Sequence, residues 1–120
     1  MMFGLKEEHI AAIHQCFTHY PAIEKIIIYG SRATENYRYN SDIDLVIIDQ
    51  NMSYPDLLKL ENEIDDLMLP YKMDLSLKRN IRNSDLLTHI ERAGKTFYER
   101  VEQIVLNEPP LEYGNKETDN

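Results

Sequence analysis

Residues 26–48 read IIIYGSRATENYRYNSDIDLVII and contain two short apolar runs, 26–29 and 45–48, separated by a polar connection. Both runs are rich in β-branched residues and are bounded by turn-forming residues, a pattern typical of β-strands. We therefore predict two neighbouring strands, 23–29 and 43–49. The remainder of the chain is interpreted around this pair.

Two acidic residues, Asp42 and Asp44, stand at the start of the second predicted strand. Successive side chains of a strand alternate between its faces, so these two carboxylates project from the same side. Like charges at this spacing repel, and a cation between them relieves the repulsion. Because a hard divalent cation such as Mg²⁺ prefers oxygen ligands, the pair predicts a metal site.

The residues after the first predicted strand suit a phosphate. Gly30 permits a sharp exit from the strand, and Ser31 can cap a helical turn whose N–H groups face an incoming phosphate. Arg32 follows, and it either contacts the phosphate or holds an aspartate in place. Gly-Ser turns and acidic pairs also occur on surfaces without catalysis, so the spacing alone leaves that alternative open.

A third carboxylate, Asp74, falls in the segment 72–77, KMDLSL, which alternates polar and apolar residues without a fault. This period of two predicts a strand with its apolar side chains inward and Asp74 on the opposite face. A carboxylate in mid-strand is disfavoured and needs a reason. One explanation is an ordinary outward acid paired with Lys72 or Lys78.

Helical periodicity predicts three helices: one over 5–20, one opened by Ser53 and stopped by Pro70, and one capped by Asn83 or Ser84 and ended by Gly94. A short last strand is predicted at 96–98. The expected fold is α/β, a small mixed sheet of about four strands with helices mainly on one side. We expect one domain over 1–100, followed by an acidic tail, 101–120, that docks on a partner or is disordered.

The net charge is −8, from 13 basic and 21 acidic residues. This balance disfavours direct binding of nucleic acid or an anionic membrane. The chain has no run of eighteen apolar residues and no basic, apolar leader, so we expect a soluble, cytoplasmic protein. The one cysteine, Cys16, excludes an intramolecular disulfide, and a histidine metal site is not expected. Basic residues within 70–98 could meet a triphosphate or simply form a solvated face.

The motif Gly30-Ser31, ten residues, Asp42, one residue, Asp44, with its strings GSRA and SDIDL, resembles the signature of the DNA polymerase β-like nucleotidyltransferase superfamily. It is most similar to the smallest branch, the minimal nucleotidyltransferases (MNT). The resemblance covers about residues 5–100 and implies the nucleotidyltransferase fold, with Asp74 as the third carboxylate. It implies Mg²⁺ bound by the three aspartates and ATP bound by Gly30, Ser31 and Arg32. One departure is Glu35, where the family often has glycine.

The same resemblance implies a function. Members of this branch often pair with a HEPN-domain toxin, so the resemblance implies Mg²⁺-dependent transfer of AMP from ATP to a hydroxyl of that partner. The acceptor it implies is a tyrosine of the toxin, and the protein acts as antitoxin. The alternative is a non-catalytic nucleotide-binding module that neutralises its partner by direct binding. The retained acids, which repel one another, weigh against that alternative.

Overall fold

The computed structural model describes residues 2–38 and 40–101 of the 120-residue chain. Its elements follow in the order α1 (Glu7–Phe17), β1 (Ile23–Tyr29), β2 (Ile43–Asp49), α2 (Tyr54–Asp65), β3 (Met73–Leu77), the short 3-10 helix η1 (Lys78–Asn80), α3 (Ser84–Ala93) and β4 (Lys95–Glu99). The predictions made for the tail fall almost entirely on 102–120, outside the described residues.

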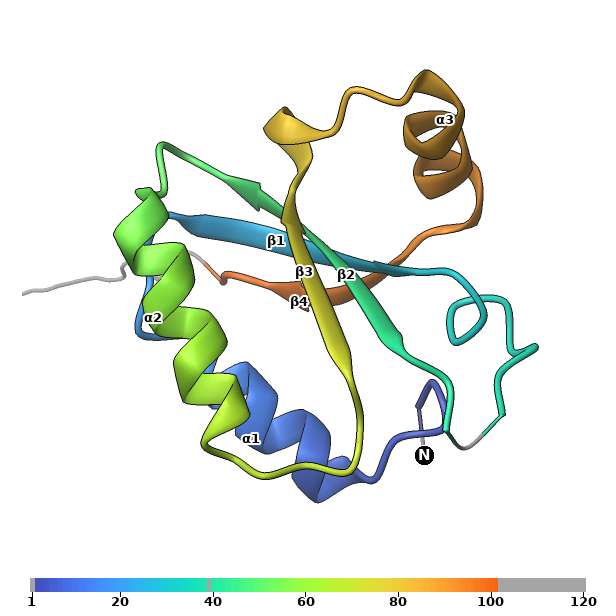
Figure 1. Ribbon diagram of the computed structural model, residues 1–120, viewed down its shortest axis with the longest axis horizontal. Coiled ribbons are helices and arrows are strands. Elements are labelled where there is room, and N and C mark those ends of the chain that lie inside the picture. The colour runs from blue at the N-terminus through green and yellow to red at the C-terminus, as the bar shows by residue number, and fades with distance from the viewer. Residues whose placement is uncertain (1, 39, 102–120) are drawn as a thin grey trace, which may run out of the picture.

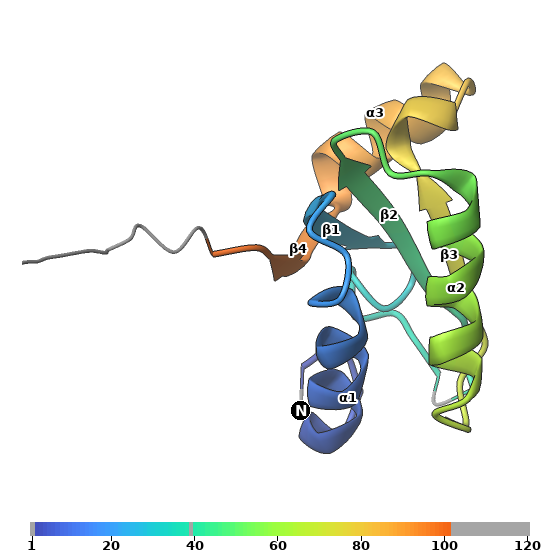
Figure 2. The same ribbon diagram turned by 90° about the vertical axis from the view of Figure 1, so that its left-hand side faces the viewer.

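The four strands form one mixed sheet in the order β3-β2-β1-β4. β2 and β3 are parallel, whereas β1 is antiparallel to both β2 and β4. α1 and α2 lie beside each other, and α3 lies apart from them at the far end of the molecule (Figures 1 and 2). The predicted fold class, a small mixed sheet of about four strands with most of its helices on one side, is confirmed.

The core lies between the sheet and the pair α1 and α2. Alternate residues of β1 and β2, among them Ile26, Ile28, Leu45 and Ile47, are fully buried in it. Side chains on one face of each helix complete the same cluster: Ile13, Cys16 and Phe17 from α1, and Leu57, Leu60 and Ile64 from α2. Asp44 lies at the start of β2, on the face opposite the core. The strand therefore faces the core on one side and begins with a polar side chain on the other.

Local capping signals placed two helix starts correctly. The Ser53 hydroxyl accepts from the Asp56 N–H at 3.2 Å, and the Asn83 side chain accepts from the Leu86 N–H at 3.0 Å. The end of α2 was predicted less well, because the helix stops at Asp65 and not at Pro70. Met68 has a φ of 56°, so the chain has already left the helical conformation before the proline.

The last strand contains an irregularity that the sequence did not predict. Ile26 pairs with Tyr98 and Ile27 with Thr96, which leaves Phe97 as an extra residue in a β-bulge. The rings of Phe97 and Tyr98 both lie near Phe17, with centroids at 6.2 and 5.1 Å. The bulge therefore lets two consecutive aromatic residues pack against the same helix.

No helix among the described residues is long and apolar enough to cross a lipid bilayer.

Candidate functional site

The pairing of three strands aligns a row of polar side chains on the sheet face opposite the core. Tyr29 of β1 is paired with Asp44 of β2, and Asp44 is paired in turn with Asp74 of β3. Residues directly opposite each other on adjacent strands project from the same face. The fold therefore brings Asp74 beside Asp44, although thirty positions separate them in the chain.

The electrostatics of Asp44 show that all three carboxylates lie in one region. Its pKa is raised, first by partial burial and then by the negative charges of Asp74 and Asp42. The same two effects, burial and the charges of Asp44 and Asp74, raise the pKa of Tyr29. Each additional negative charge makes the ionised form of its neighbours less favourable, which is the condition that a bound cation relieves.

The donor set has the chemistry of a site for a hard cation, because it consists of carboxylate oxygens. As the side chains stand, no group of three or more His, Cys, Asp or Glu residues in the described part of the chain is arranged to hold a metal ion. Asp42 and Asp74 are exposed at the surface, so rotation about their side-chain bonds is not restricted by packing. The three acids therefore supply the kind of donor atom that a hard cation takes, and Asp44 is the least exposed of them.

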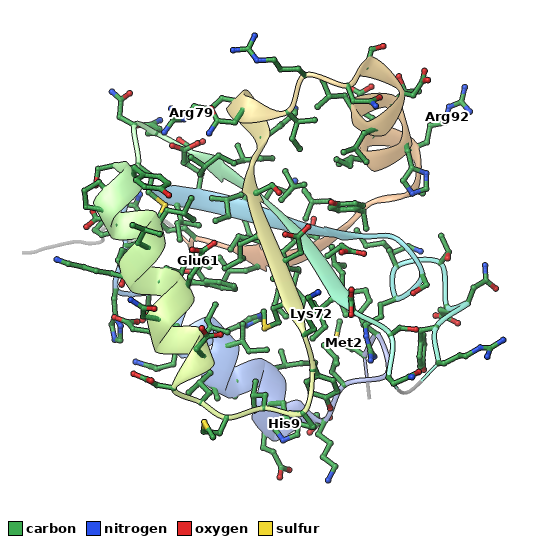
Figure 3. The ribbon with its side chains drawn as sticks, in the orientation of Figure 1. Met2, His9, Glu61, Lys72, Arg79 and Arg92 are labelled. Atoms are coloured by element: carbon green, nitrogen blue, oxygen red, sulfur yellow. The ribbon has the colours of Figure 1, made fainter. Side chains whose placement is uncertain are left out.

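The alternative for Asp74, an ion pair with Lys72 or Lys78, does not form among residues 2–38 and 40–101. Two other basic residues of the segment 70–98, Arg79 and Arg92, lie away from Asp74. Figure 3 shows Arg79 just beyond the end of β3 and Arg92 on α3. Arg79 forms an ion pair with Asp49, at the end of β2 remote from Asp44, with 3.1 Å between Nε and Oδ2.

Gly30 is required by both conformation and space. Its φ is +80°, in the left-handed region that favours glycine. A Cβ atom added at this position would lie 2.8 Å from Oδ2 of Asp44. The turn after β1 and the central carboxylate of β2 are therefore in close contact, which brings the turn that was predicted to bind phosphate next to the acidic row.

The single helical turn that was predicted at Ser31 is present as a turn over residues 31–35. The Gly30 carbonyl accepts from the N–H groups of Ala33 and Thr34 at 3.1 and 3.3 Å, and the Ser31 carbonyl accepts from Asn36 at 2.9 Å. No hydrogen bond within the described residues uses the N–H or hydroxyl of Ser31 as donor, so both are available to a ligand.

Glu35 closes this turn with a φ of 64°. A non-glycine residue in the left-handed region is strained, and glycine is not. The departure from the family pattern noted at this position is thus a side chain placed in a backbone conformation that suits glycine.

Arg32 does not line the site, contrary to the prediction that it binds the nucleotide. It has no exposed surface, and its guanidinium donates to the carbonyl oxygens of Ser41 and Phe3. Of the two predicted roles, the placement favours the one in which Arg32 holds an aspartate, since Ser41 directly precedes Asp42. The sequence gives no signal of this burial, because the rings that contact the guanidinium, Tyr37 and Tyr71, become its neighbours only in the folded protein.

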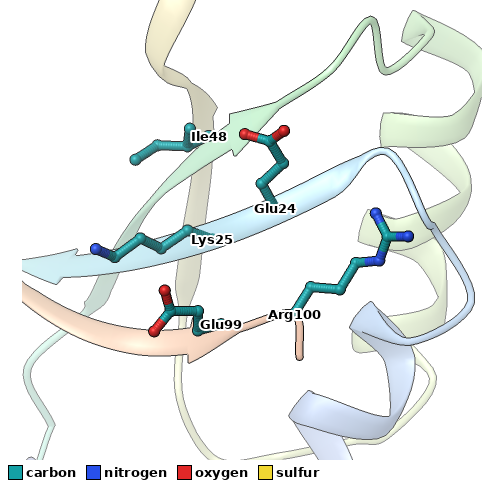
Figure 4. Close-up of a pocket in the computed structure, with 5 residues that line it drawn as sticks. All are labelled: Glu24, Lys25, Ile48, Glu99 and Arg100. Atoms are coloured by element: carbon teal, nitrogen blue, oxygen red, sulfur yellow. The ribbon is translucent and has the colours of Figure 1, made fainter. Parts of the chain in front are cut away.

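Two hollows lie away from the acidic row. One, of about 430 Å³, lies where the start of β1 meets the end of β2 and is lined by Glu24, Lys25, Ile48, Glu99 and Arg100 (Figure 4). The other, of about 280 Å³, lies between α3 and the sheet, with Ile27, Val46, Leu87 and Ile90 among its lining residues. Neither is lined by a residue of the candidate site.

Residues 11–103 match the sequence family described as polymerase beta, nucleotidyltransferase. The chain belongs to this nucleotidyltransferase family. A candidate protein adenylyltransferase of Methanocaldococcus jannaschii is 39% identical to the chain over 70 residues, which cover 58% of this chain and 70% of that protein. The family and this relative together identify the chain as a nucleotidyltransferase.

Solved structures share the nucleotidyltransferase's fold at low sequence identity. A chain in a crystal structure of a toxin–antitoxin with AMP-PNP has a TM-score of 0.60 at 20% identity, over 80% of this chain and 75% of that one. A chain in the complex of tri-AMPylated Shewanella oneidensis HEPN toxin with MNT antitoxin has a TM-score of 0.58 at 15% identity, over 80% and 74%. These likenesses confirm the fold that the sequence resemblance implied.

Proposed function

We propose that this nucleotidyltransferase moves AMP from Mg²⁺-bound ATP to a hydroxyl of a partner protein, and that the partner is a HEPN toxin modified on a tyrosine. The protein then acts as the antitoxin of the pair. The observation that carries the proposal is the contact between the Gly30 turn and Asp44, whose carboxylate in turn faces Asp74 across the β2 and β3 ladder. Phosphate-binding backbone and metal-binding oxygens are thereby adjacent.

The roles of the chain's own residues follow from their places. Gly30 and Ser31 bind the β- and γ-phosphates through backbone N–H and the serine hydroxyl. Asp42, Asp44 and Asp74 would hold Mg²⁺, which supplies neutralisation of the charge on the phosphoryl oxygens and on the leaving pyrophosphate. Asp74, at the exposed edge strand β3, polarises the acceptor hydroxyl.

The reaction exchanges one bond to the α-phosphorus for another. The acceptor oxygen forms a bond to the α-phosphorus, the bond from that phosphorus to the bridging oxygen of pyrophosphate breaks, and the hydroxyl proton of the acceptor is released to solvent water. Because the attacking and leaving oxygens are in line, the acceptor approaches from the side of the α-phosphorus opposite the pyrophosphate. The pyrophosphate lies on the Gly30 turn, so the acceptor enters from the side away from that turn.

The similarities support an acceptor on another protein. The relative from Methanocaldococcus jannaschii is named as a candidate protein adenylyltransferase, and one structural neighbour is a complex that contains a tri-AMPylated HEPN toxin. Asp42 and Asp74 are exposed at the surface, so a segment of another protein can reach them. The competing function is a module that binds nucleotide and masks its partner without catalysis.

One experiment separates these functions. The protein is incubated with α-labelled ATP, Mg²⁺ and the purified product of the adjacent gene, and the label is located by peptide mass spectrometry. We expect AMP on a tyrosine of the partner, and none with Asp44→Asn or without divalent metal. Label on no residue of the partner, with a stable complex still formed and the toxin inhibited, would favour the masking module instead.

A further inference from the structure

Arg32 is the one charged side chain that is fully buried in the described part of the protein. We propose that Arg32 is a positioning residue for the transfer reaction, fixing the segments that carry Asp42 and Asp74 relative to each other. This inference rests on the proposed function, because it assigns those carboxylates to the reaction. Arginine keeps its charge when buried, so its contacts must compensate for the water that it has lost.

The first set of contacts fixes the approach to Asp42. The Nε and Nη2 groups of Arg32 both donate to the carbonyl oxygen of Ser41, at 3.1 and 2.9 Å. That carbonyl and the N–H of Asp42 belong to one planar peptide unit. The guanidinium fork therefore sets the orientation of the backbone from which Asp42 projects. Nη1 donates to the carbonyl of Phe3 at 2.9 Å, which anchors the fork to a separate segment.

The second set of contacts reaches the segment that carries Asp74. The guanidinium carbon of Arg32 lies 5.2 Å from the ring centroid of Tyr71 and 5.3 Å from that of Tyr37. The residue after Tyr71 is Lys72, whose carbonyl accepts from the Ile43 N–H at 2.8 Å, at the start of the β2 and β3 ladder. Arg32 thus contacts both segments just before the ladder position where Asp44 and Asp74 pair.

A buried cation of another shape, such as lysine, would not fix the two segments in the same way. Lysine keeps the charge, but it lacks the planar fork that holds one carbonyl with two donors and stacks on aromatic rings. Arg32→Lys therefore removes the geometry and retains the charge. The expected loss is in the alignment of Asp42 and Asp74 and not in the binding of phosphate, since Arg32 has no exposed surface.

The test compares Arg32→Lys with a matched variant at the other end of β2. Arg79 also holds a loop carbonyl, that of Met52, through Nη2 at 2.7 Å, and it is remote from the carboxylates. For Arg32→Lys we expect kcat for AMP transfer to fall about 10- to 100-fold, as misplacement of a reacting group does, with KM for ATP changed less than about threefold. Mn²⁺ affinity, measured by electron paramagnetic resonance, should fall by about 10- to 100-fold, since one of the carboxylate ligands is misaligned.

Arg79→Lys is expected to lower Tm but to leave kcat and Mn²⁺ affinity at the wild-type values. The proposal is overturned if folded Arg32→Lys retains both wild-type values, or if both variants lose kcat in proportion to Tm. Should Arg32→Lys fail to fold, Tyr71→Leu removes the ring contact and keeps the Ser41 hydrogen bonds. A wild-type kcat and Mn²⁺ affinity in that variant would also overturn it. Absence of AMP transfer in the wild type would contradict the proposed function, while the Mn²⁺ comparison would still decide the role of Arg32.

Discussion

Replacement of Asp44 by asparagine is expected to abolish transfer and to stabilise the fold at the same time. Asp44 faces Asp74 directly across the ladder and has Asp42 two residues away in the chain. Like charges on directly opposed cross-strand residues destabilise a sheet by up to about 1 kcal/mol. Asparagine has nearly the same shape, so it relieves the repulsion without the steric change that a larger residue would bring to the contact with Gly30.

The size of both effects can be estimated. Partial solvent screening reduces the gain in the free energy of unfolding to about 0.5–1 kcal/mol, which corresponds to a rise in Tm of about 2–6 °C for a domain of this size. Loss of a central metal ligand should lower the rate of AMP transfer by at least about 10³-fold, since metal stabilisation of the transition state amounts to several kcal/mol.

The gain in stability should depend on pH in a defined direction. The pKa of Asp44 is raised in the folded protein, so its ionised form is penalised there relative to the unfolded chain. As the pH falls through that raised pKa, the wild type binds a proton and recovers the lost stability. The advantage of Asp44→Asn is therefore full at pH 7.5 and shrinks as the solution becomes acidic.

Thermal unfolding followed by circular dichroism at pH 7.5 and at acidic pH, together with initial rates from labelled ATP, measures these effects. Glu61→Gln is the control, because it removes the same charge from α2, away from the acidic row (Figure 3). The control should leave the rate and the pH dependence of Tm unchanged. Transfer near the wild-type rate by Asp44→Asn would refute its catalytic role, and a Tm gain that persists undiminished at acidic pH would refute the electrostatic explanation.

Three further outcomes are expected. Gly30→Ala should lower the free energy of unfolding by about 1–2 kcal/mol, because φ is left-handed there, and should lower the transfer rate by about 100-fold, because the new Cβ displaces the Asp44 carboxylate. Chemical denaturation and initial rates test this prediction. An unaltered rate would show that the turn does not contribute to catalysis. Glu35→Gly should raise the free energy of unfolding by about 0.5–1 kcal/mol and leave the transfer rate unchanged, since it relieves a strained φ. A lower stability of this variant in urea would show that the Glu35 side chain stabilises the fold by more than its φ costs. ATP should bind weakly without divalent metal and measurably better with Mg²⁺, because its own charges otherwise face those of Asp42, Asp44 and Asp74; equal affinities by calorimetry would remove the metal from the mechanism.

The elements of the fold were predictable because their signals are local. Apolar runs predicted β1 and β2, strict alternation predicted β3, and the side chains of Ser53 and Asn83 predicted the starts of two helices. Each of these signals acts within a few residues, through side-chain periodicity or a hydrogen bond to a backbone N–H group close in sequence. The end of α2 and the bulge at Phe97 were not predictable in this way, since packing against distant residues decides them.

The sequence by itself determined that Asp42 and Asp44 share one face of a strand, because alternation along an extended backbone needs no other part of the chain. Only the tertiary structure decided that Asp74 is paired with Asp44, since strand register depends on which residues of two distant segments bury together. It also decided that Gly30 touches the Asp44 carboxylate and that Arg32 is buried against Ser41 and Tyr71. A charged side chain next to a predicted phosphate turn has the sequence signature of a ligand-binding residue. Because segments far away in the chain bury Arg32, it is instead a residue that positions the carboxylates.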